Sequence, residues 1–320
     1  MIDTVLQIWI ALALDGCLGD PRRLPHPVRF IGRAALALEG PARRLIPSAR
    51  MAGVVTAALV VGGTIVITGL LLGMARRVSP LAGDLFSILA FYTAFAARDL
   101  ADHALAVAQP LAAGDLAAAR RKVARLVGRD TEHLDADGIT RATVESVAEN
   151  TVDGVLAPLF FAFLFGPVGA LGYKAASTLD STFGYKNARY RLFGWASARL
   201  DDAANYLPAR LGLLCIALAA GCTGARFMAV LRIAWRDSRH HASPNAGYPE
   251  AAFAAALGVQ LGGPVMRAGT WQQMPLMGDA VRPLARHHIG ASVALMIRTT
   301  LIAALIGTAA AVAWRAGGGS

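Results

Sequence analysis

The stretch AGVVTAALVVGGTIVITGLLLGM, residues 52–74, decides the fold class, because it is almost entirely apolar and carries no charge. Its length is near the roughly 20 residues with which a helix crosses a hydrocarbon core of about 30 Å. Residues 81–97 and 291–314 are comparable, and residues 5–19 form a weaker fourth candidate. Because residues 5–19 lack the basic leader and cleavage signal of a signal peptide, we expect them to be retained.

Composition supports a membrane protein along the whole chain. Hydrophobic residues make up 55% of the 320 and charged residues only 16%, which lies outside the range of ordinary soluble proteins. We therefore predict an all-α, polytopic integral membrane protein that forms a single integral membrane domain over residues 1–320. Its motif-rich polar region spans residues 128–250.

The charges of the loops predict the topology. Lys and Arg are frequent in the large loops, and loops of this kind face the cytoplasm. Two apolar segments are poor spans: residues 155–172 are interrupted by Gly166-Pro167, and residues 211–224 are too short to cross unaided. If both are re-entrant or buried, four helices span and every polar loop is cytoplasmic; otherwise six span. We expect about four to six transmembrane or re-entrant helices, with large cytoplasmic helical loops.

Several classes of function lose support. The net charge of +10 is spread through loops without a dense basic tract, so nucleic acid is a poor partner, whereas anionic lipid headgroups and phosphate-bearing substrates fit. The three cysteines lie in apolar segments and form no zinc motif. No standard phosphate loop, dinucleotide-binding glycine motif or serine-hydrolase elbow occurs.

Three carboxylates have helical spacing in TRATVESVAENTVDG. Glu145, Glu149 and Asp153 lie at i, i+4 and i+8, so a helix would place them on one face with Asn150 beside it. Unpaired carboxylates repel one another, and Mg²⁺ relieves that repulsion while it binds substrate phosphates. Two alternatives stay open: a solvated face neutralised by basic groups such as Arg129 or Arg141, and general acid/base work.

A second group of polar residues lies in ARLDDAANYLPAR. Adjacent carboxylates on a helix point about 100° apart, so Asp201 and Asp202 cannot both serve one function unless the backbone bends. Asp202 and Asn205 are i, i+3 neighbours that could face a site together, and the alternative is pairing of the aspartate with arginine. Asp180, among Ser, Thr and Gly in STLDSTFGYK, is equally suited to a helix end and to a ligand role.

Two proline-containing loops hold further candidates. In GDPRRLPHPVRFIG, His26 and Arg29 could bind a carboxylate or phosphate, although a lone histidine is more often a packed loop residue. In SPNAGYPE, a turn leads into a helix, with Asn245 and Glu250 as polar candidates. The preceding His240-His241 pair lacks a third metal ligand.

Six motifs together resemble one family of cobalamin biosynthesis, the adenosylcobinamide-phosphate synthase (CobD/CbiB) family, over about residues 15–270. They are GDPRRLPHPVRFIG, VGRDT, ESVAENTVDGVLAPLFF, TLDSTFGYKNARY, ARLDDAANYLPARL and SPNAGYPEAAFAAALGVQLGG. The chain departs from the family at Ser177, where asparagine is more usual. The resemblance implies an integral membrane enzyme, and from the loop charges we expect it in the inner membrane with its site facing the cytoplasm. The resemblance also implies ATP-dependent amide formation between the free propionate of adenosylcobyric acid and aminopropanol or its phosphate.

The implied reaction uses ATP and Mg²⁺, and it gives the candidate residues roles. Glu145, Glu149 and Asp153, supported by Asp180 or Asp202, would hold Mg²⁺ on phosphates while an acyl phosphate forms. Phosphate and substrate oxygens would be bound by a wider set of residues: Arg29, Asn150, Lys174, Lys186, Arg199, Asn205 and Asn245. His26 or a remaining carboxylate would take the proton from the incoming ammonium.

Two functions of other classes remain alternatives. A transporter or channel subunit would also place polar residues beside broken helices, although the chain shows no internal repeat. A non-catalytic membrane scaffold that gathers other cobalamin-biosynthesis enzymes would share the resemblance. Corrinoid binding without turnover would distinguish the scaffold from the enzyme.

Overall fold

The computed structural model describes residues 2–317 except 21–25, 186, 223 and 225. The contacts of the chain cluster into two compact units. Unit 1 comprises Met1–Ala96, Ala157–Asn205 and Gly307–Ser320, and unit 2 comprises Ala97–Leu156 and Tyr206–Ile306. Both units contain parts of apolar helices, so this division does not separate a membrane part from a soluble part. The single integral membrane domain stays a prediction.

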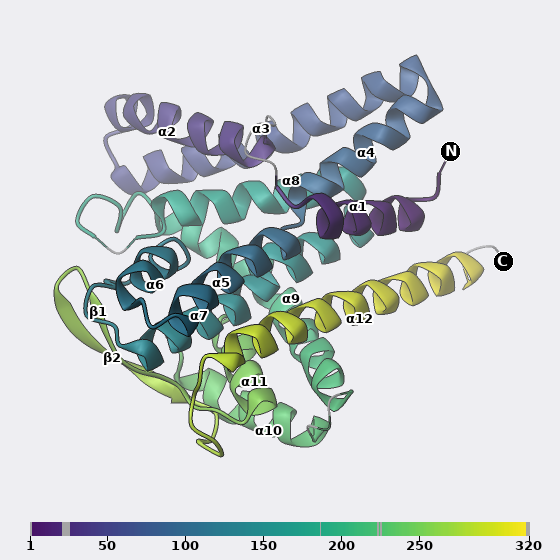
Figure 1. The fold of residues 1–320 in the computed structure, drawn as a ribbon. Helices are drawn as coiled ribbons and strands as arrows, with labels where there is room; N and C mark the ends of the chain where they lie inside the picture. Colours follow the sequence, from purple (N-terminus) through teal and green to yellow (C-terminus); the bar gives the residue numbers. More distant parts are fainter. Residues whose placement is uncertain (1, 21–25, 186, 223, 225, 318–320) are drawn as a thin grey trace. The chain divides into compact units, whose positions relative to one another are not determined.

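Unit 1 consists of helices (Figure 1). They are α1 (Thr4–Leu18), α2 (Pro27–Leu45), α3 (Ala49–Val78), α4 (Pro80–Ala94) and α8 (Ala157–Phe183), together with the first part of α9 (Trp195–Gly221) and the last part of α12 (His287–Gly317).

Unit 2 combines helices with a hairpin (Figure 1). Its elements are α5 (Ala97–Ala112), α6 (Leu116–Val123), α7 (Ala136–Thr151), the π-helical turn η1 (Val152–Leu156), α10 (Phe227–Asp237), the 3₁₀ turn η2 (Ser238–His240), α11 (Gly247–Leu257), β1 (Leu261–Arg267) and β2 (Thr270–Met277), together with the last part of α9 and the first part of α12.

Local sequence signals explain where the first long helices begin. The Ser48 side chain caps α3 by accepting a hydrogen bond from the Met51 amide. A single residue, Ser79, separates α3 from α4, where it caps the second helix and is followed by Pro80 in the first turn. Proline is tolerated there because the first amides of a helix have no partner within it. The two helices therefore form a tight antiparallel hairpin.

Five helical segments are long and apolar enough to cross a membrane by length and composition. They are Ala49–Val78, Pro80–Ala112, Ala136–Phe183, Trp195–Gly221 and His287–Gly317. This number lies within the predicted four to six, and the all-α class is confirmed apart from the hairpin. The predicted spans 52–74, 81–97 and 291–314 lie inside three of these segments, whereas residues 5–19 form only a 15-residue helix.

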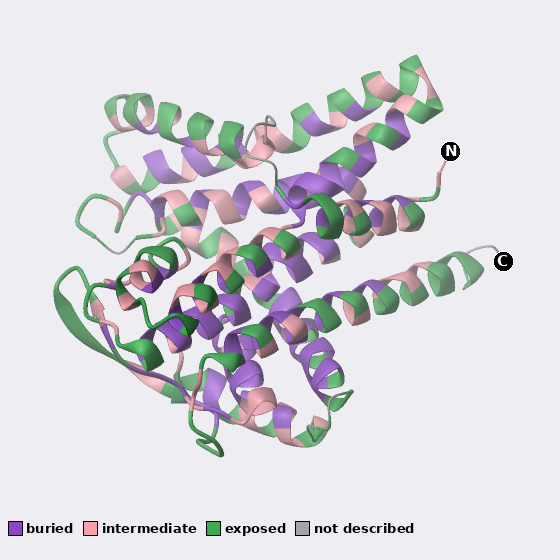
Figure 2. Ribbon diagram, in the orientation of Figure 1, coloured by how far each residue is buried: buried purple, intermediate pink, exposed green. Residues whose placement is uncertain are grey.

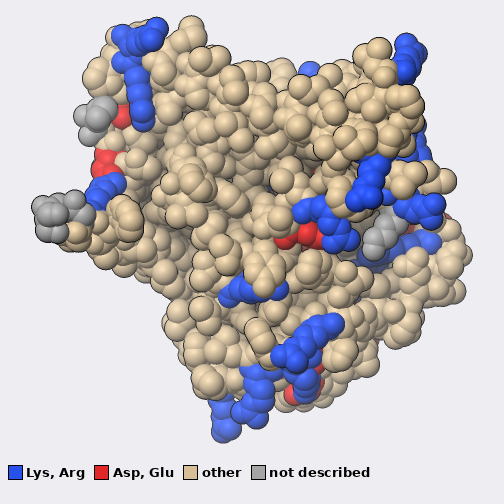
Figure 3. All heavy atoms as spheres, turned by 180° about the vertical axis from the view of Figure 1, so that it is seen from behind, with Lys and Arg blue, Asp and Glu red and all other residues tan. Residues whose placement is uncertain are grey.

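The surface of α3 is typical of a lipid-facing helix. Large apolar side chains such as Leu59, Ile67 and Leu70 are exposed along it, and Figure 2 shows the exposed and half-buried residues on this part of the chain. On the face of the molecule drawn in Figure 3, uncharged residues cover most of the area and charged side chains gather in a few groups. Such a surface fits the multi-pass membrane protein that the sequence predicts.

The two doubtful segments are each part of a longer helix. Residues 155–172 continue from α7 through η1 into α8, with one non-helical residue at Gly166, where φ is 63°. Residues 211–224 were predicted to be too short to span a membrane. This prediction was wrong, because their helix, α9, already begins at Trp195 and has 27 residues. In its polar first half, Arg199 pairs with Asp202 and Asn205 pairs with Asp201 within the helix, and each pair adds a little to its stability.

A two-stranded antiparallel sheet was not predicted. β1 and β2 pair from Leu261 with Met277 to Arg267 with Thr270, with a bulge between Leu261 and Gly263. Packed helices form the core of unit 2, in which Ile139, Phe253 and Met296 are fully buried. The core of unit 1 gathers Ile31, Leu179, Phe183 and Phe193.

Candidate functional site

Glu145 on α7 is held by two donors in unit 2. One carboxylate oxygen accepts a hydrogen bond from the Arg129 guanidinium at 2.5 Å, and the other accepts one from the Gly262 amide at 2.7 Å. Both charged side chains are largely buried, with 7% of the Glu145 side chain and 13% of the Arg129 side chain exposed. Arg129 is thus the counter-charge that the solvated-face alternative named, in a buried setting.

The β1–β2 hairpin is attached to α7 and to the loop before it. Arg141 donates to the Gly262 carbonyl at 2.7 Å, and the Asp130 amide donates to the Met266 carbonyl at 2.9 Å. The Asp130 carboxylate in turn accepts the Gly269 amide at 2.8 Å. These contacts keep the Gly262 amide pointed at Glu145.

Only glycine fits at position 262. Its φ is 84°, a region that favours glycine, and a Cβ there would lie 2.0 Å from the Pro275 carbonyl oxygen. The close approach of the two strands at the bulge therefore depends on this residue.

Two further carboxylates lie close enough to Glu145 to influence one another's charge. Glu149 is exposed, although most residues of α7 before it are buried. On α11, burial raises the pKa of the Glu250 carboxyl well above its usual value, and the charges of Glu149 and Glu145 raise that pKa further. Arg129 and Arg267 oppose this rise. The three glutamates and two arginines form what we call the glutamate cluster.

His241 lies next to Glu250. Its Nε2 lies 3.6 Å from a Glu250 carboxylate oxygen, and both side chains are nearly buried. His241 Nδ1 lies 3.0 Å from the Ser243 amide nitrogen and 3.3 Å from the Ser243 carbonyl oxygen, and Nε2 faces the glutamate. Burial lowers the pKa of His241 below its usual value, a shift that the Ser243 contact and the charge of Glu145 partly oppose.

The predicted i, i+4, i+8 face is only partly formed. Glu145 and Glu149 lie on the regular α-helix, but α7 ends at Thr151 and Asp153 belongs to the π-helical turn η1. A π-turn has more residues per turn, so Asp153 departs from the spacing on which the prediction relied. Asn150 donates its side-chain amide to the Ser146 carbonyl at 2.9 Å on its own helix.

The described residues include no group of three or more His, Cys, Asp or Glu side chains placed to hold a metal ion. Both oxygens of Glu145 already accept hydrogen bonds, which leaves Glu149 as the exposed carboxylate of the pair. This donor set does not fit a cage made by the protein alone. It fits Mg²⁺ that arrives on substrate phosphates and takes one protein carboxylate.

Asn245 also belongs to unit 2 and is buried before α11. Its carbonyl oxygen accepts a hydrogen bond from Arg210 at 3.3 Å, and the Arg210 guanidinium lies 3.4 Å from the Tyr206 ring centroid. Asn245 therefore helps to fix an arginine that stacks on an aromatic ring.

The other predicted residues lie in unit 1, where α9 carries two separate pairings. Arg199 donates to Asp202 at 3.1 Å, which is the arginine pairing that the sequence left open. Asn205 is buried and contacts Asp201 at 3.1 Å and the Tyr173 hydroxyl at 2.9 Å. The two adjacent aspartates thus contact different partners, as their angular separation predicts.

The remaining candidates of unit 1 lie on α8 and α2 or just beyond their ends. Asp180 and Lys174 are half-buried on α8, and the Asp180 carbonyl accepts the Gly184 amide in the last turn. His26 caps α2, with Nδ1 accepting the Val28 amide at 3.3 Å and Nε2 3.7 Å from Asp20. Arg29 is exposed on the same helix, and Lys186 lies outside the described residues.

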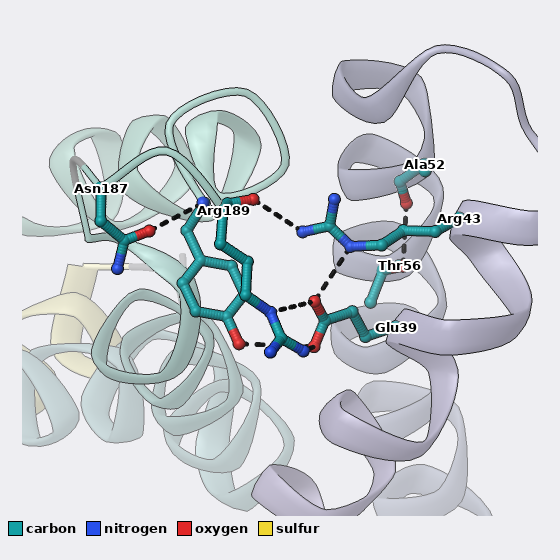
Figure 4. A network of polar contacts seen from close by, with 7 residues as sticks. Glu39, Arg43, Ala52, Thr56, Asn187 and Arg189 are labelled. Atoms are coloured by element: carbon teal, nitrogen blue, oxygen red, sulfur yellow. Dashed lines mark hydrogen bonds and ion pairs between the residues drawn. The ribbon is translucent and has the colours of Figure 1, made fainter.

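Figure 4 shows a polar network in unit 1 that sequence reasoning missed. Glu39, buried on α2, accepts hydrogen bonds from Arg43 at 2.9 Å and from two nitrogens of Arg189 at 3.2 and 3.1 Å. Arg43 also donates to the Arg189 carbonyl at 2.9 Å. Burial alone would raise the pKa of Glu39, but the two arginines hold it below its usual value. The network fastens the segment between α8 and α9 to α2.

Sequence reasoning also missed three members or neighbours of the glutamate cluster. Arg267 lies in the unpredicted hairpin, and Glu250 was noted only as a polar residue after a turn. His241 was considered only as a metal ligand. No local spacing joins these residues to α7, and only the shared motif SPNAGYPE pointed towards Glu250.

Comparisons with known proteins extend over nearly the whole chain. The profile of the family described as "CobD/Cbib protein" matches residues 8–296. "Cobalamin biosynthesis protein CobD" of Pelobacter propionicus is 46% identical over 312 residues, which are 98% of this chain and 96% of that protein. "Cobalamin biosynthesis protein CbiB" of Salmonella typhimurium is 45% identical over 307 residues, or 95% and 96%. No solved structure matches the chain.

Proposed function

Because this chain belongs to the CobD/CbiB family, we propose that it is a membrane enzyme of cobalamin biosynthesis that forms an amide bond. The substrates are adenosylcobyric acid, ATP with Mg²⁺, and aminopropanol or aminopropanol phosphate. The product is adenosylcobinamide or its phosphate. Five helical segments long enough to span support a multi-pass protein, which we place in the inner membrane with its site facing the cytoplasm.

The glutamate cluster is the observation that carries this proposal. Amide formation from a carboxylate is unfavourable in water, so the propionate must be activated by phosphate transfer. Arg129 and Arg267 supply positive charge and Glu149 supplies an exposed carboxylate in the same part of unit 2. Such a mixture suits phosphates that arrive with Mg²⁺, since arginine binds phosphate oxygens and a carboxylate binds the ion.

The chemical steps follow from that arrangement. The propionate oxygen attacks the terminal phosphorus of ATP, and ADP leaves as the acyl phosphate forms. The neutral amine then attacks the acyl carbon, the amide C–N bond forms, and inorganic phosphate leaves. The incoming ammonium loses two protons in all. We assign acceptance of the first, before the amine attacks, to Glu250, the nearly buried carboxylate that faces His241, and the second leaves with the inorganic phosphate.

Mass-spectrometric product analysis tests the reaction. The detergent-purified protein is incubated with adenosylcobyric acid, ATP and Mg²⁺, and with aminopropanol or aminopropanol phosphate in separate reactions. We expect a corrinoid mass gain that matches amide formation with one donor, which also identifies the amine. If the corrinoid binds but neither donor gives a product, the non-catalytic scaffold replaces the enzyme.

A further inference from the structure

Unit 1 contains an apolar groove whose lining includes none of the candidate site residues discussed above. It has a volume of about 460 Å³ and is lined by α2, α3 and α4, with Leu171 of α8 at one side. Residues from Pro27 to Leu38 form the α2 wall, residues from Leu59 to Leu71 form the α3 wall, and residues from Phe86 to Thr93 form the α4 wall.

The side chains that line the groove are apolar apart from threonines. Its few hydroxyl groups belong to threonines, and two of these bond to their own helices. Thr64 donates to the Val60 carbonyl at 2.7 Å, and Thr93 donates to the Leu89 carbonyl at 3.0 Å. A polar molecule in the groove would lose its water contacts without gaining hydrogen bonds there, so an apolar occupant is favoured.

The length of the groove is close to the thickness of one leaflet of a bilayer. Two of its walls, α3 and α4, belong to segments able to span a membrane. From Leu59 to Leu71 the helix advances about 18 Å at 1.5 Å per residue, which is close to half of a hydrocarbon core about 30 Å thick. An extended acyl chain that enters from one surface would run along the groove.

A cation lies beside the groove on α2. Arg33 is exposed and follows Phe30 by three residues, so the two side chains are neighbours on the helix surface. Phe30 lines the groove. A long arginine side chain at this position can reach a phosphate group while its stem packs on apolar surface.

We propose that the groove binds one phospholipid, with an acyl chain between α2, α3 and α4 and its phosphate contacted by Arg33. This site is independent of the amide-forming reaction. It places a lipid against the amphipathic helix α2, whose buried Glu39 fastens the segment between α8 and α9.

Two adjacent glycines of α3 allow a matched test. Gly63 lines the groove and Gly62 does not, and a Cβ at either position meets no atom within 4 Å. Gly63→Leu therefore directs a large side chain into the groove with room for its Cβ, whereas Gly62→Leu adds the same side chain elsewhere on the helix. Both changes replace glycine in a helix, so neither should unfold the protein.

The full-length protein is reconstituted in nanodiscs with a phospholipid that carries a photoactivatable group in its acyl chain, and cross-linked peptides are quantified by mass spectrometry. We expect labelling to concentrate on residues 59–71 and 86–93. Gly63→Leu should lower it at least fivefold, and Gly62→Leu should leave it within twofold of the wild type. Equal labelling in all three proteins, or labelling spread evenly over the exposed face of α12, would overturn the site.

Arg33→Gln tests the headgroup contact. In nanodiscs with equal amounts of anionic and zwitterionic labelled lipid, the wild type should favour the anionic lipid, since a cation beside the groove attracts it. The variant should bring the labelling ratio close to one. An unchanged ratio would show that Arg33 does not contact the phosphate and would overturn that part of the proposal.

Discussion

Replacing Glu145 by glutamine tests whether the Arg129–Glu145 pair holds α7 to the hairpin. The two carboxylate oxygens each face a donor, Arg129 at 2.5 Å and the Gly262 amide at 2.7 Å. Glutamine offers one oxygen and one NH₂ group, so one donor always meets another donor. The largely buried arginine also loses the carboxylate with which it pairs directly.

Breaking a buried ion pair from one side costs about 3–5 kcal/mol, and we take about 3 because Arg129 keeps some exposure. For a chain of 320 residues, with an unfolding entropy of about 2.1 cal/mol/K per residue, about 1.5 °C is lost per kcal/mol, which predicts a fall of about 4–5 °C in melting temperature. Thermal unfolding of the detergent-purified protein measures it. Removing both charges in Arg129→Gln/Glu145→Gln should cost less than the sum of the single changes, by about 1–3 kcal/mol.

Glu132→Gln is the matched control, because Glu132 lies in the same unit and is exposed. This change of charge at the surface should stay within about 0.5 kcal/mol of the wild type. A melting temperature for Glu145→Gln within about 2 °C of the control would refute the reasoning, since the buried pair would then contribute no more than a surface charge.

Three further predictions concern single positions. Gly262→Ala should destabilise by at least roughly 1–3 kcal/mol, from its positive φ and from the clash with the opposite strand, and should melt below Gly269→Ala, where φ is also positive but the space is open. Because the pKa of Glu39 is lower in the folded protein, its contribution to stability is complete above about pH 4.3 and is lost as the pH falls through the folded pKa. Melting of the wild type between pH 5 and 3 should thus fall more steeply than that of Glu39→Gln. The pKa of Glu250 is raised instead, so ionisation costs the folded state stability as the pH rises above about 4.3, and Glu250→Gln should gain melting temperature relative to the wild type between pH 4 and 8.

The sequence predicted what depends on local patterns. The apolar run 52–74 lies within α3, and Glu145 and Glu149 share one regular helix. These predictions succeeded because hydrophobic length and the period of 3.6 residues act between near neighbours in the chain. The alternative of an arginine partner for Glu145 was also available from the local motif VGRDT.

The rest depends on contacts between distant parts of the chain. The Gly262 amide donates to Glu145, which lies 117 residues earlier in the chain, and no spacing in the sequence indicates that hydrogen bond. The hairpin was missed because β1 is short and contains two glycines and a proline, which weaken any strand pattern. The π-turn that displaces Asp153 has no distinct sequence signal, so a regular helix was assumed.

Turnover of Glu149→Gln tests most directly the proposal that the amide bond forms at the glutamate cluster. This exposed carboxylate should not be needed for folding, so the variant is expected to melt within about 2 °C of the wild type. With the donor that the wild type uses, product formation should fall at least a hundredfold and lose its normal dependence on Mg²⁺ concentration. Glu132→Gln should keep wild-type turnover. Unchanged turnover and Mg²⁺ dependence in Glu149→Gln would contradict the proposal.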